Sequence, residues 1–172
     1  MKVFIAGARS LSRLNPSVIE KLMNIKNQNF TVLVGDANGI DVSVQEFYYA
    51  LGYKNVIVYA SNGKARNNVG NWKVQKVNVP KNVTGFDFYA QKDLQMSIDA
   101  DYGLMVWNGK SRGTFNNIVN LTNQEKKVAV YVTTIKDFRY LSNPSQVKLM
   151  LDSITYIPKV NVIMNSNIQL LL

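Results

Sequence analysis

Residues 102–114 read YGLMVWNGKSRGT, and this stretch decides the fold of the chain. The apolar run from Tyr102 to Trp107 predicts a buried strand. Small and basic residues follow it, and from Thr114 onward apolar residues recur at helical spacing. A strand, a glycine-rich loop and a helix start form an arrangement that binds phosphate, because the first N–H groups of a helix have no partner within it and the helix dipole favours an anion. The stretch therefore predicts a phosphate-bearing ligand.

The same strand–loop–helix pattern recurs along the chain. The predicted strands cover residues 2–6, 30–34, 55–59, 102–107 and 127–132, and the predicted helices cover residues 16–25, 41–51, 86–100 and 114–124. These strands are continuously apolar, as in a parallel sheet covered on both faces. We therefore expect a doubly wound α/β fold, with a mainly parallel sheet of about five to seven strands and helices on both faces.

Other segments carry weaker patterns. Residues 61–85 are rich in asparagine, glycine and lysine and predict a long loop, with a short edge strand within 72–79. Pro144 begins a predicted helix that runs to about Ile154. We expect residues 155–172 either to add an edge strand or to order only in an oligomer.

We expect a single domain over residues 1–172, with a core of 1–132 and a C-terminal extension of 133–172. A chain of 172 residues with 47% hydrophobic content can bury a sizeable core. The sequence contains no run of 18 apolar residues and no signal peptide, so we expect a soluble, cytoplasmic protein.

Composition excludes several chemistries. The absence of cysteine excludes disulfides and thiolate catalysis, and the absence of histidine excludes an imidazole base, histidine-bound zinc and a Ser-His-Asp triad. The formal net charge of +9 suits an anionic ligand, from a nucleotide to a nucleic acid. A lysine-rich soluble surface explains the charge equally well, because the basic residues are scattered. We expect no cofactor.

The loop after the first predicted strand contains Gly7, Arg9 and Ser10. Glycine lets the backbone approach a ligand, and arginine can bind phosphate or carboxylate through two hydrogen bonds. The alternative is a plain turn with a surface arginine.

The loop after the second predicted strand contains Gly35, Gly39 and Asp41. The two glycines suit a tight turn. Asp41 either caps the following helix, which is the commoner role, or accepts a hydrogen bond from a ribose hydroxyl. The G-x-G-x-x-G fingerprint of dinucleotide-binding proteins is absent after the first strand.

Three segments resemble the motifs of the SLOG superfamily of Rossmann-like domains. They read GARS at 7–10, GDANGID at 35–41 and ADYGLMVWNGKSRGT at 100–114, and their order and spacing fit over roughly residues 1–132. The superfamily includes the DNA-processing protein A family, the LOG phosphoribohydrolases and nucleotide sensors.

The resemblance implies a ligand pocket formed by three loops. Arg9 and Ser10 would lie near phosphate or ribose, residues 35–41 would wall the pocket, and the last motif would bind phosphate. The candidate binding residues are Gly7, Arg9, Ser10, Gly35, Asp36, Gly39, Asp41, Lys92, Trp107, Gly109, Lys110, Ser111, Gly113 and Thr114.

Lys92 joins this set because small members of the superfamily commonly carry a basic residue, an Asx residue and a methionine before the last motif, which Lys92, Asp93 and Met96 resemble. Lys92 and Met96 are one helical turn apart and share a face. Taken alone, a lysine on a helix surface is expected to be solvated.

Two positions depart from the family pattern. LOG-type hydrolases carry a glutamate three residues after the threonine that matches Thr114, and this chain has Asn117 there, which cannot act as a carboxylate base. Asp36 stands where the family usually has glycine, and we expect it to add negative charge near the pocket.

We expect a module that binds or senses a nucleotide or a nucleotide-derived molecule, in preference to an enzyme. The first alternative is an enzyme that cleaves or transfers at an N-glycosidic bond, such as a phosphoribohydrolase or deoxyribosyltransferase. The second is a nucleic-acid-binding protein, with Trp72 and Tyr89 as the exposed stacking candidates. We expect no membrane partner. The apolar residues at 47–49 and 168–172 predict a homodimer or a larger homo-oligomer.

Overall fold

The computed structural model describes residues 1–155, which form seven strands and five helices. In chain order the elements are β1 (Lys2–Gly7), α1 (Pro16–Asn27), β2 (Thr31–Val34), α2 (Ile40–Ala50), β3 (Val56–Ser61), β4 (Lys73–Val77), α3 (Gly85–Asp99), β5 (Tyr102–Trp107), α4 (Arg112–Asn123), β6 (Lys127–Val132), β7 (Asp137–Leu141) and α5 (Pro144–Thr155). Among the described residues, no helix has the length and apolar character needed to cross a membrane.

The strands form one sheet in the order β4-β3-β2-β1-β5-β6-β7. All neighbours are parallel except β6 and β7, which are antiparallel. From β1 the chain moves outward through β2 and β3 to β4, and it then returns to place β5 on the other side of β1. The strand order therefore reverses between β1 and β5. Open α/β sheets bind ligands at such a point, in the crevice beyond the carboxyl ends of the strands.

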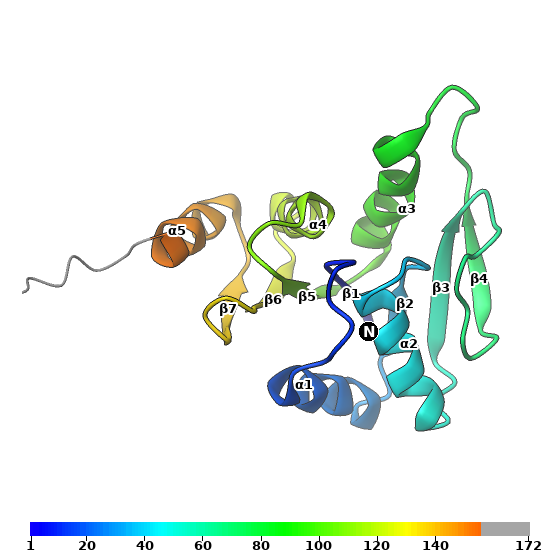
Figure 1. Cartoon of the computed structure of the whole chain (residues 1–172), viewed down its shortest axis with the longest axis horizontal. Helices are drawn as coiled ribbons and strands as arrows, with labels where there is room; N and C mark the ends of the chain where they lie inside the picture. The colour runs from blue at the N-terminus through cyan, green and yellow to red at the C-terminus, as the bar shows by residue number, and fades with distance from the viewer. Residues whose placement is uncertain (156–172) are drawn as a thin grey trace, which may run out of the picture.

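Helices cover both faces of the sheet, with α1 and α2 on one face and α3, α4 and α5 on the other (Figure 1). Successive side chains of β1 point to opposite faces. Val3 and Ile5 join the core beneath α1 and α2, whereas Phe4 and Ala6 join the core beneath α3 and α4. Burial on both faces explains why the strands read as continuous apolar runs.

The predicted fold class is confirmed, and the edge strand expected within residues 72–79 is β4. By contrast, β7 is absent from the predicted strands. Its partly buried Phe138 alternates with the charged Asp137 and Arg139, and Lys136 takes a left-handed conformation in the turn (φ 52°) where glycine or asparagine would have signalled a hairpin. The edge strand expected after residue 155 lies outside the described residues.

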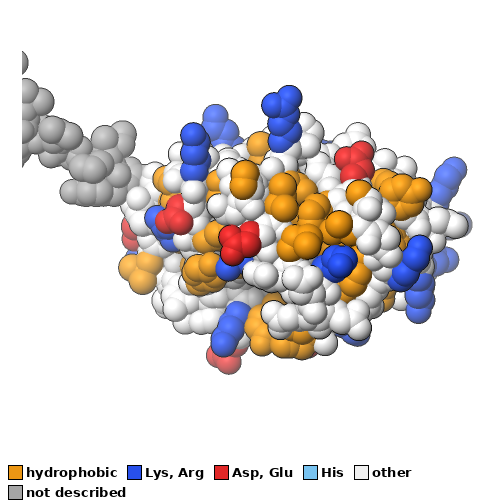
Figure 2. Space-filling view, turned by 90° about the horizontal axis from the view of Figure 1, so that it is seen from below, with side chains coloured by type: hydrophobic (Ala, Val, Ile, Leu, Met, Phe, Trp, Pro, Cys, Tyr) orange, Lys and Arg blue, Asp and Glu red, His pale blue; other side chains and the backbone are white. Residues whose placement is uncertain are grey.

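The apolar surface of α2 is smaller than its sequence suggests. Tyr48 is fully buried and donates its hydroxyl to the carbonyl of Leu22 at 3.1 Å, so the expectation that it offers surface for assembly is wrong. Tyr49 and Leu51 are exposed by 60% and 40%. Figure 2, a view from below Figure 1, shows hydrophobic side chains grouped on this face with lysine and arginine side chains between them.

Assembly through the end of α2 stays a prediction. Tyr49→Lys combined with Leu51→Lys should convert a dimer into a monomer, because charges on an apolar surface oppose its burial in an interface. Light scattering at micromolar concentration should give about twice the chain mass of 19.4 kDa for the wild type and the chain mass for the variant. A wild-type mass of one chain would contradict the prediction.

Candidate functional site

A cavity of about 680 Å³ lies at the carboxyl ends of β1 and β5. The loops after these strands, the start of α2 and the starts of α3 and α4 all contribute to its lining. Of the predicted binding residues, it is lined by Gly7, Arg9, Ser10, Asp41, Lys92, Lys110, Ser111, Gly113 and Thr114. Gly35, Asp36, Gly39, Trp107 and Gly109 lie outside this lining.

Side chains at the end of β5 hold the loop before α4 in a fixed shape. The Asn108 carboxamide oxygen accepts hydrogen bonds from the N–H groups of Lys110 at 3.0 Å and Ser111 at 2.8 Å. The Trp107 indole N–H donates to the carbonyl of Ser111 at 3.1 Å. Trp107 is 4% exposed, so its indole supports the loop from beneath.

The helix α4 begins at Arg112, two residues before the predicted start at Thr114, because Ser111 is its N-cap. The Ser111 hydroxyl accepts from the Thr114 N–H at 3.4 Å and lies 3.0 Å from the Thr114 hydroxyl. Within the described part of the chain, the N–H groups of Arg112 and Gly113 have no hydrogen-bond partner. Two backbone donors at the positive end of the helix dipole are therefore available to an anion.

Three cations surround these donors. Arg9, Lys110 and Arg112 are exposed, line the cavity and take part in none of the ion pairs among residues 1–155. Their charge is not compensated within the described fold, so this end of the cavity attracts anions.

The loop after β1 packs beside the loop between β5 and α4. The Asn108 carboxamide N–H donates to the Ser10 hydroxyl at 3.1 Å, and the Ala8 N–H donates to the carbonyl of Val106 at 3.1 Å. Gly39 has a positive φ of 84°, and a side chain there would collide with the backbone of Arg9. The fold thus brings the three glycine-bearing loops together, as the sequence predicts.

Asp36 lies just behind the cavity and is 3% exposed. Its carboxylate accepts from the Arg66 guanidinium at 2.7 and 3.1 Å and from the Arg66 backbone N–H at 3.0 Å. Burial acts to raise the pKa of Asp36, but the hydrogen bonds from Arg66 and the charge of Lys92 outweigh it, so the pKa is below its usual value. Asp36 therefore carries the expected negative charge, and the adjacent Arg66 and Lys92 cations compensate it.

Lys92 is a buried cation and not the solvated surface lysine that its helix position alone suggests. Its side chain is 3% exposed, and its ammonium lies 2.6 Å from Asp93 and 3.8 Å from Asp36. Burial lowers the pKa of Lys92, but Asp93 and Asp41 outweigh burial and raise the pKa above its ordinary value. Gly35 makes room for this cluster, because a side chain there would collide with the Lys92 ammonium and the Asp41 carboxylate.

Asp41 is not the N-cap of α2, which is Gly39. It lies in the first turn, is 6% exposed, and accepts a hydrogen bond from the Ala37 N–H at 3.2 Å. The expectation that Asp41 caps the helix is therefore wrong. That it accepts a hydrogen bond from a ribose hydroxyl stays a prediction. Burial raises the pKa of the Asp41 carboxyl to about 7, although the charge of Lys92 opposes the rise.

Several lining residues are missing from the predicted site. Arg66 comes from the long loop between β3 and β4, and Phe86 and Tyr89 come from the start of α3. The only signal for Arg66 is the length of its loop, since long loops in compact domains are often functional. Of the predicted stacking residues, Tyr89 is 40% exposed, whereas Trp72 is buried and donates its indole N–H to the carbonyl of Tyr53.

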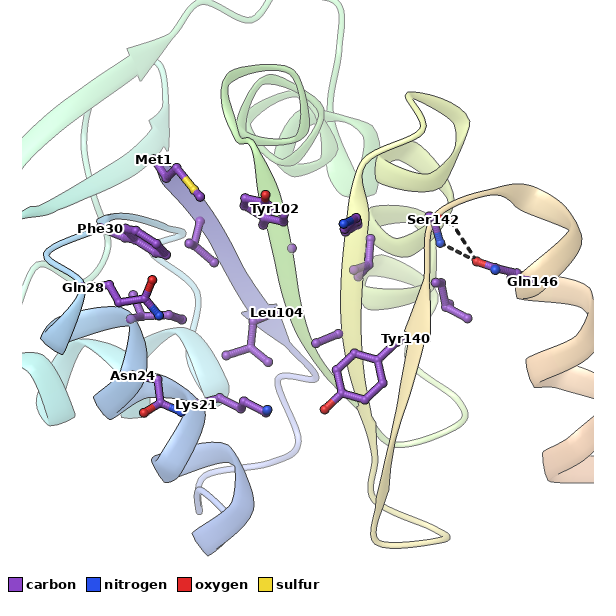
Figure 3. A pocket seen from close by; sticks show the side chains of 17 residues that line it. Met1, Lys21, Asn24, Gln28, Phe30, Tyr102, Leu104, Tyr140, Ser142 and Gln146 are labelled. Carbon is purple, nitrogen blue, oxygen red and sulfur yellow. Dashed lines mark hydrogen bonds between the residues drawn. The ribbon is translucent and has the colours of Figure 1, made fainter.

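A second cavity of about 600 Å³ lies at the opposite edge of the sheet, near the amino ends of the parallel strands (Figure 3). Its lining includes the side chains of Leu104 and Tyr140. The ammonium nitrogen of Lys21 lies 5.7 Å from the ring centre of Tyr140. No predicted binding residue lines this cavity.

Asp41→Asn should change how stability depends on pH. The pKa of Asp41 is about 7 in the folded protein against an ordinary value of 3.8, so the folded state holds a proton that the unfolded state releases. The contribution of Asp41 to wild-type stability therefore falls as the pH rises from about 4 to about 7. Asparagine keeps the acceptor for Ala37 but does not titrate, so the variant should exceed the wild type by on the order of 4 kcal/mol at about pH 8 and by little at about pH 4. Urea unfolding measures the difference in stability between variant and wild type at each pH. Equal differences at the two pH values would contradict the raised pKa of Asp41.

Comparisons with known proteins support the fold. No protein-family model and no curated protein sequence matches this chain. Among solved structures, the chain is similar to DNA processing protein A from Helicobacter pylori, a protein described by its single-stranded DNA binding mode. The two are 14% identical with a TM-score of 0.59, over 89% of this chain and 72% of that chain. The likeness shows a shared Rossmann-like fold.

Proposed function

We propose that this protein binds a nucleotide or a nucleotide-derived molecule in the cavity at the carboxyl edge of the sheet. The observation that carries the proposal is the convergence of unused backbone donors and uncompensated cations at the start of α4. Backbone N–H groups, arginine and lysine together favour a phosphate group. A volume of about 680 Å³ suits a ligand of nucleotide size, within the usual range for small-molecule sites.

We further propose that the chain is a small member of the SLOG superfamily that senses or sequesters its ligand without turning it over. Asn117 lines the cavity and is 3% exposed, and its amide stands where the family resemblance implies a catalytic glutamate. An amide cannot serve as a general base. Steady release of free base from a nucleotide, abolished by Asn117→Ala, would reverse this part of the proposal.

Phosphate-bearing nucleotides should raise the melting temperature, and the matching nucleosides should do so far less. A ligand at a hundredfold excess over its dissociation constant stabilises the folded state by roughly 2.7 kcal/mol, which corresponds to roughly 5–10 °C for a domain of this size. Lys110→Gln combined with Arg112→Gln should remove most of the shift. Differential scanning fluorimetry with mono-, di- and cyclic nucleotides measures it.

The matched control is Lys148→Gln, which removes an exposed lysine of α5 outside the cavity and should leave the shift intact. Ser111→Ala is a poorer probe, because loss of the N-cap of α4 costs about 1 kcal/mol before any ligand is added. A complete panel of nucleotides without a thermal shift would refute the binding proposal.

Single-stranded DNA is the second candidate ligand, favoured by the described binding mode of the structurally similar Helicobacter protein. A fluorescein-labelled oligothymidine should then bind with an affinity that falls steeply with salt, by about 0.7 logarithmic units per contacted phosphate and tenfold change in salt. Arg9→Gln should remove one phosphate contact and so reduce the slope of log affinity against log salt by about 0.7, as measured by fluorescence anisotropy. Absence of binding at low salt would eliminate this candidate.

A further inference from the structure

Two arginine–aromatic pairs form one wall of the cavity. Phe86 and Tyr89 lie one turn apart near the start of α3, and each is 40% exposed. The guanidinium carbon of Arg112 lies 4.5 Å from the ring centre of Phe86, and that of Arg66 lies 4.2 Å from the ring centre of Tyr89. All four residues line the cavity.

The two arginines differ in how their charge is compensated. Arg66 donates from its guanidinium to both carboxylate oxygens of Asp36, which neutralises its charge and holds its plane in place. Arg112 forms no ion pair within residues 1–155 and is the first residue of α4. The wall therefore attracts anions at the Arg112 end and offers a flat, charge-compensated surface at the Arg66 end.

We propose that the Arg66–Tyr89 pair is the subsite for a nucleobase, so that the ligand is a complete nucleotide and not a sugar phosphate. This inference rests on the proposed function of the same cavity. Bases stack on aromatic rings and on guanidinium planes, because every base has a flat π surface. A rigid, charge-compensated platform suits an uncharged base, and the phosphate then lies at the other end of the wall, beside Arg112.

Asp93 supports this orientation. It follows Tyr89 by one helical turn, so the two side chains share a face of α3, and both residues line the cavity. The Asp93 carboxylate is bound to the Lys92 ammonium at 2.6 Å but is 23% exposed. A carboxylate has about four acceptor positions, so Asp93 retains capacity for the N–H or O–H groups of a nucleoside.

Titration calorimetry with AMP and with ribose 5-phosphate tests the subsite on the full chain. The wild type should bind AMP at least about fivefold more tightly, since stacking of one base contributes this much or more. Tyr89→Leu should lose about tenfold in affinity for AMP and leave the affinity for ribose 5-phosphate unchanged. Tyr89→Phe, which keeps the ring, should retain AMP binding, and Tyr140→Leu, a matched change of an exposed tyrosine on β7 outside this cavity, should alter neither affinity.

Two results would overturn the base subsite while leaving phosphate binding in place. One is equal wild-type affinity for AMP and ribose 5-phosphate, a comparison that depends on no variant. The other is an equal loss of both affinities in Tyr89→Leu. A wild-type protein that binds neither compound nor any nucleotide of the thermal-shift panel would instead refute the proposed function, and the base subsite with it.

Discussion

The buried carboxylate of Asp36 fixes the geometry of the ligand edge. It lies in the loop after β2, yet its two cationic partners come from distant segments, Arg66 from the loop between β3 and β4 and Lys92 from α3. A buried charge is tolerated only when it is paired, so loss of a cationic partner would destabilise this part of the fold. Asp36 therefore holds the long loop and the middle of α3 against the end of β2. Asn67 reinforces this link by donating to the Asp36 carbonyl at 2.8 Å.

The cations around the cavity are of two kinds, those paired with carboxylates and those without an ion-pair partner among the described residues. The sequence alone does not distinguish them. Arg66 and Lys92 are neutralised by carboxylates and maintain the shape of the cavity, whereas Arg9, Lys110 and Arg112 are exposed and form no ion pair among the described residues. Only the second group can contribute its full charge to an anion. The net charge of +9 therefore says little about how strongly the cavity attracts an anion. The number of nearby cations without an ion-pair partner is more informative.

Much of the fold follows from the sequence because strands buried on both faces leave continuous apolar runs, and because glycine-bearing loops after such strands meet at one edge of a parallel sheet. The site is harder to predict, since burial of a polar side chain depends on partners far away in the chain. Lys92 looks solvated on its own helix and becomes buried only because Asp36 and Asp93 surround it. Trp72 looks exposed within a polar loop, but its indole fills a space beside Tyr53. Only the resemblance of residues 92–96 to a superfamily motif marks Lys92 as part of the site, and no local pattern marks Trp72 as buried.

The outer strand β4 has a consequence for the behaviour of the protein in concentrated solution. Within residues 1–155 no strand pairs with its outer edge, and such an edge would ordinarily be a template on which another chain could add a strand. Lys73 and Lys76 are exposed on this short strand, which forms one end of the sheet (Figure 1). Two such edges brought together would place like charges side by side, with repulsion that weakens as salt is added. Lysines at positions 73 and 76 thus oppose edge-to-edge pairing of two β4 strands, the contact that would extend the sheet from one molecule into the next.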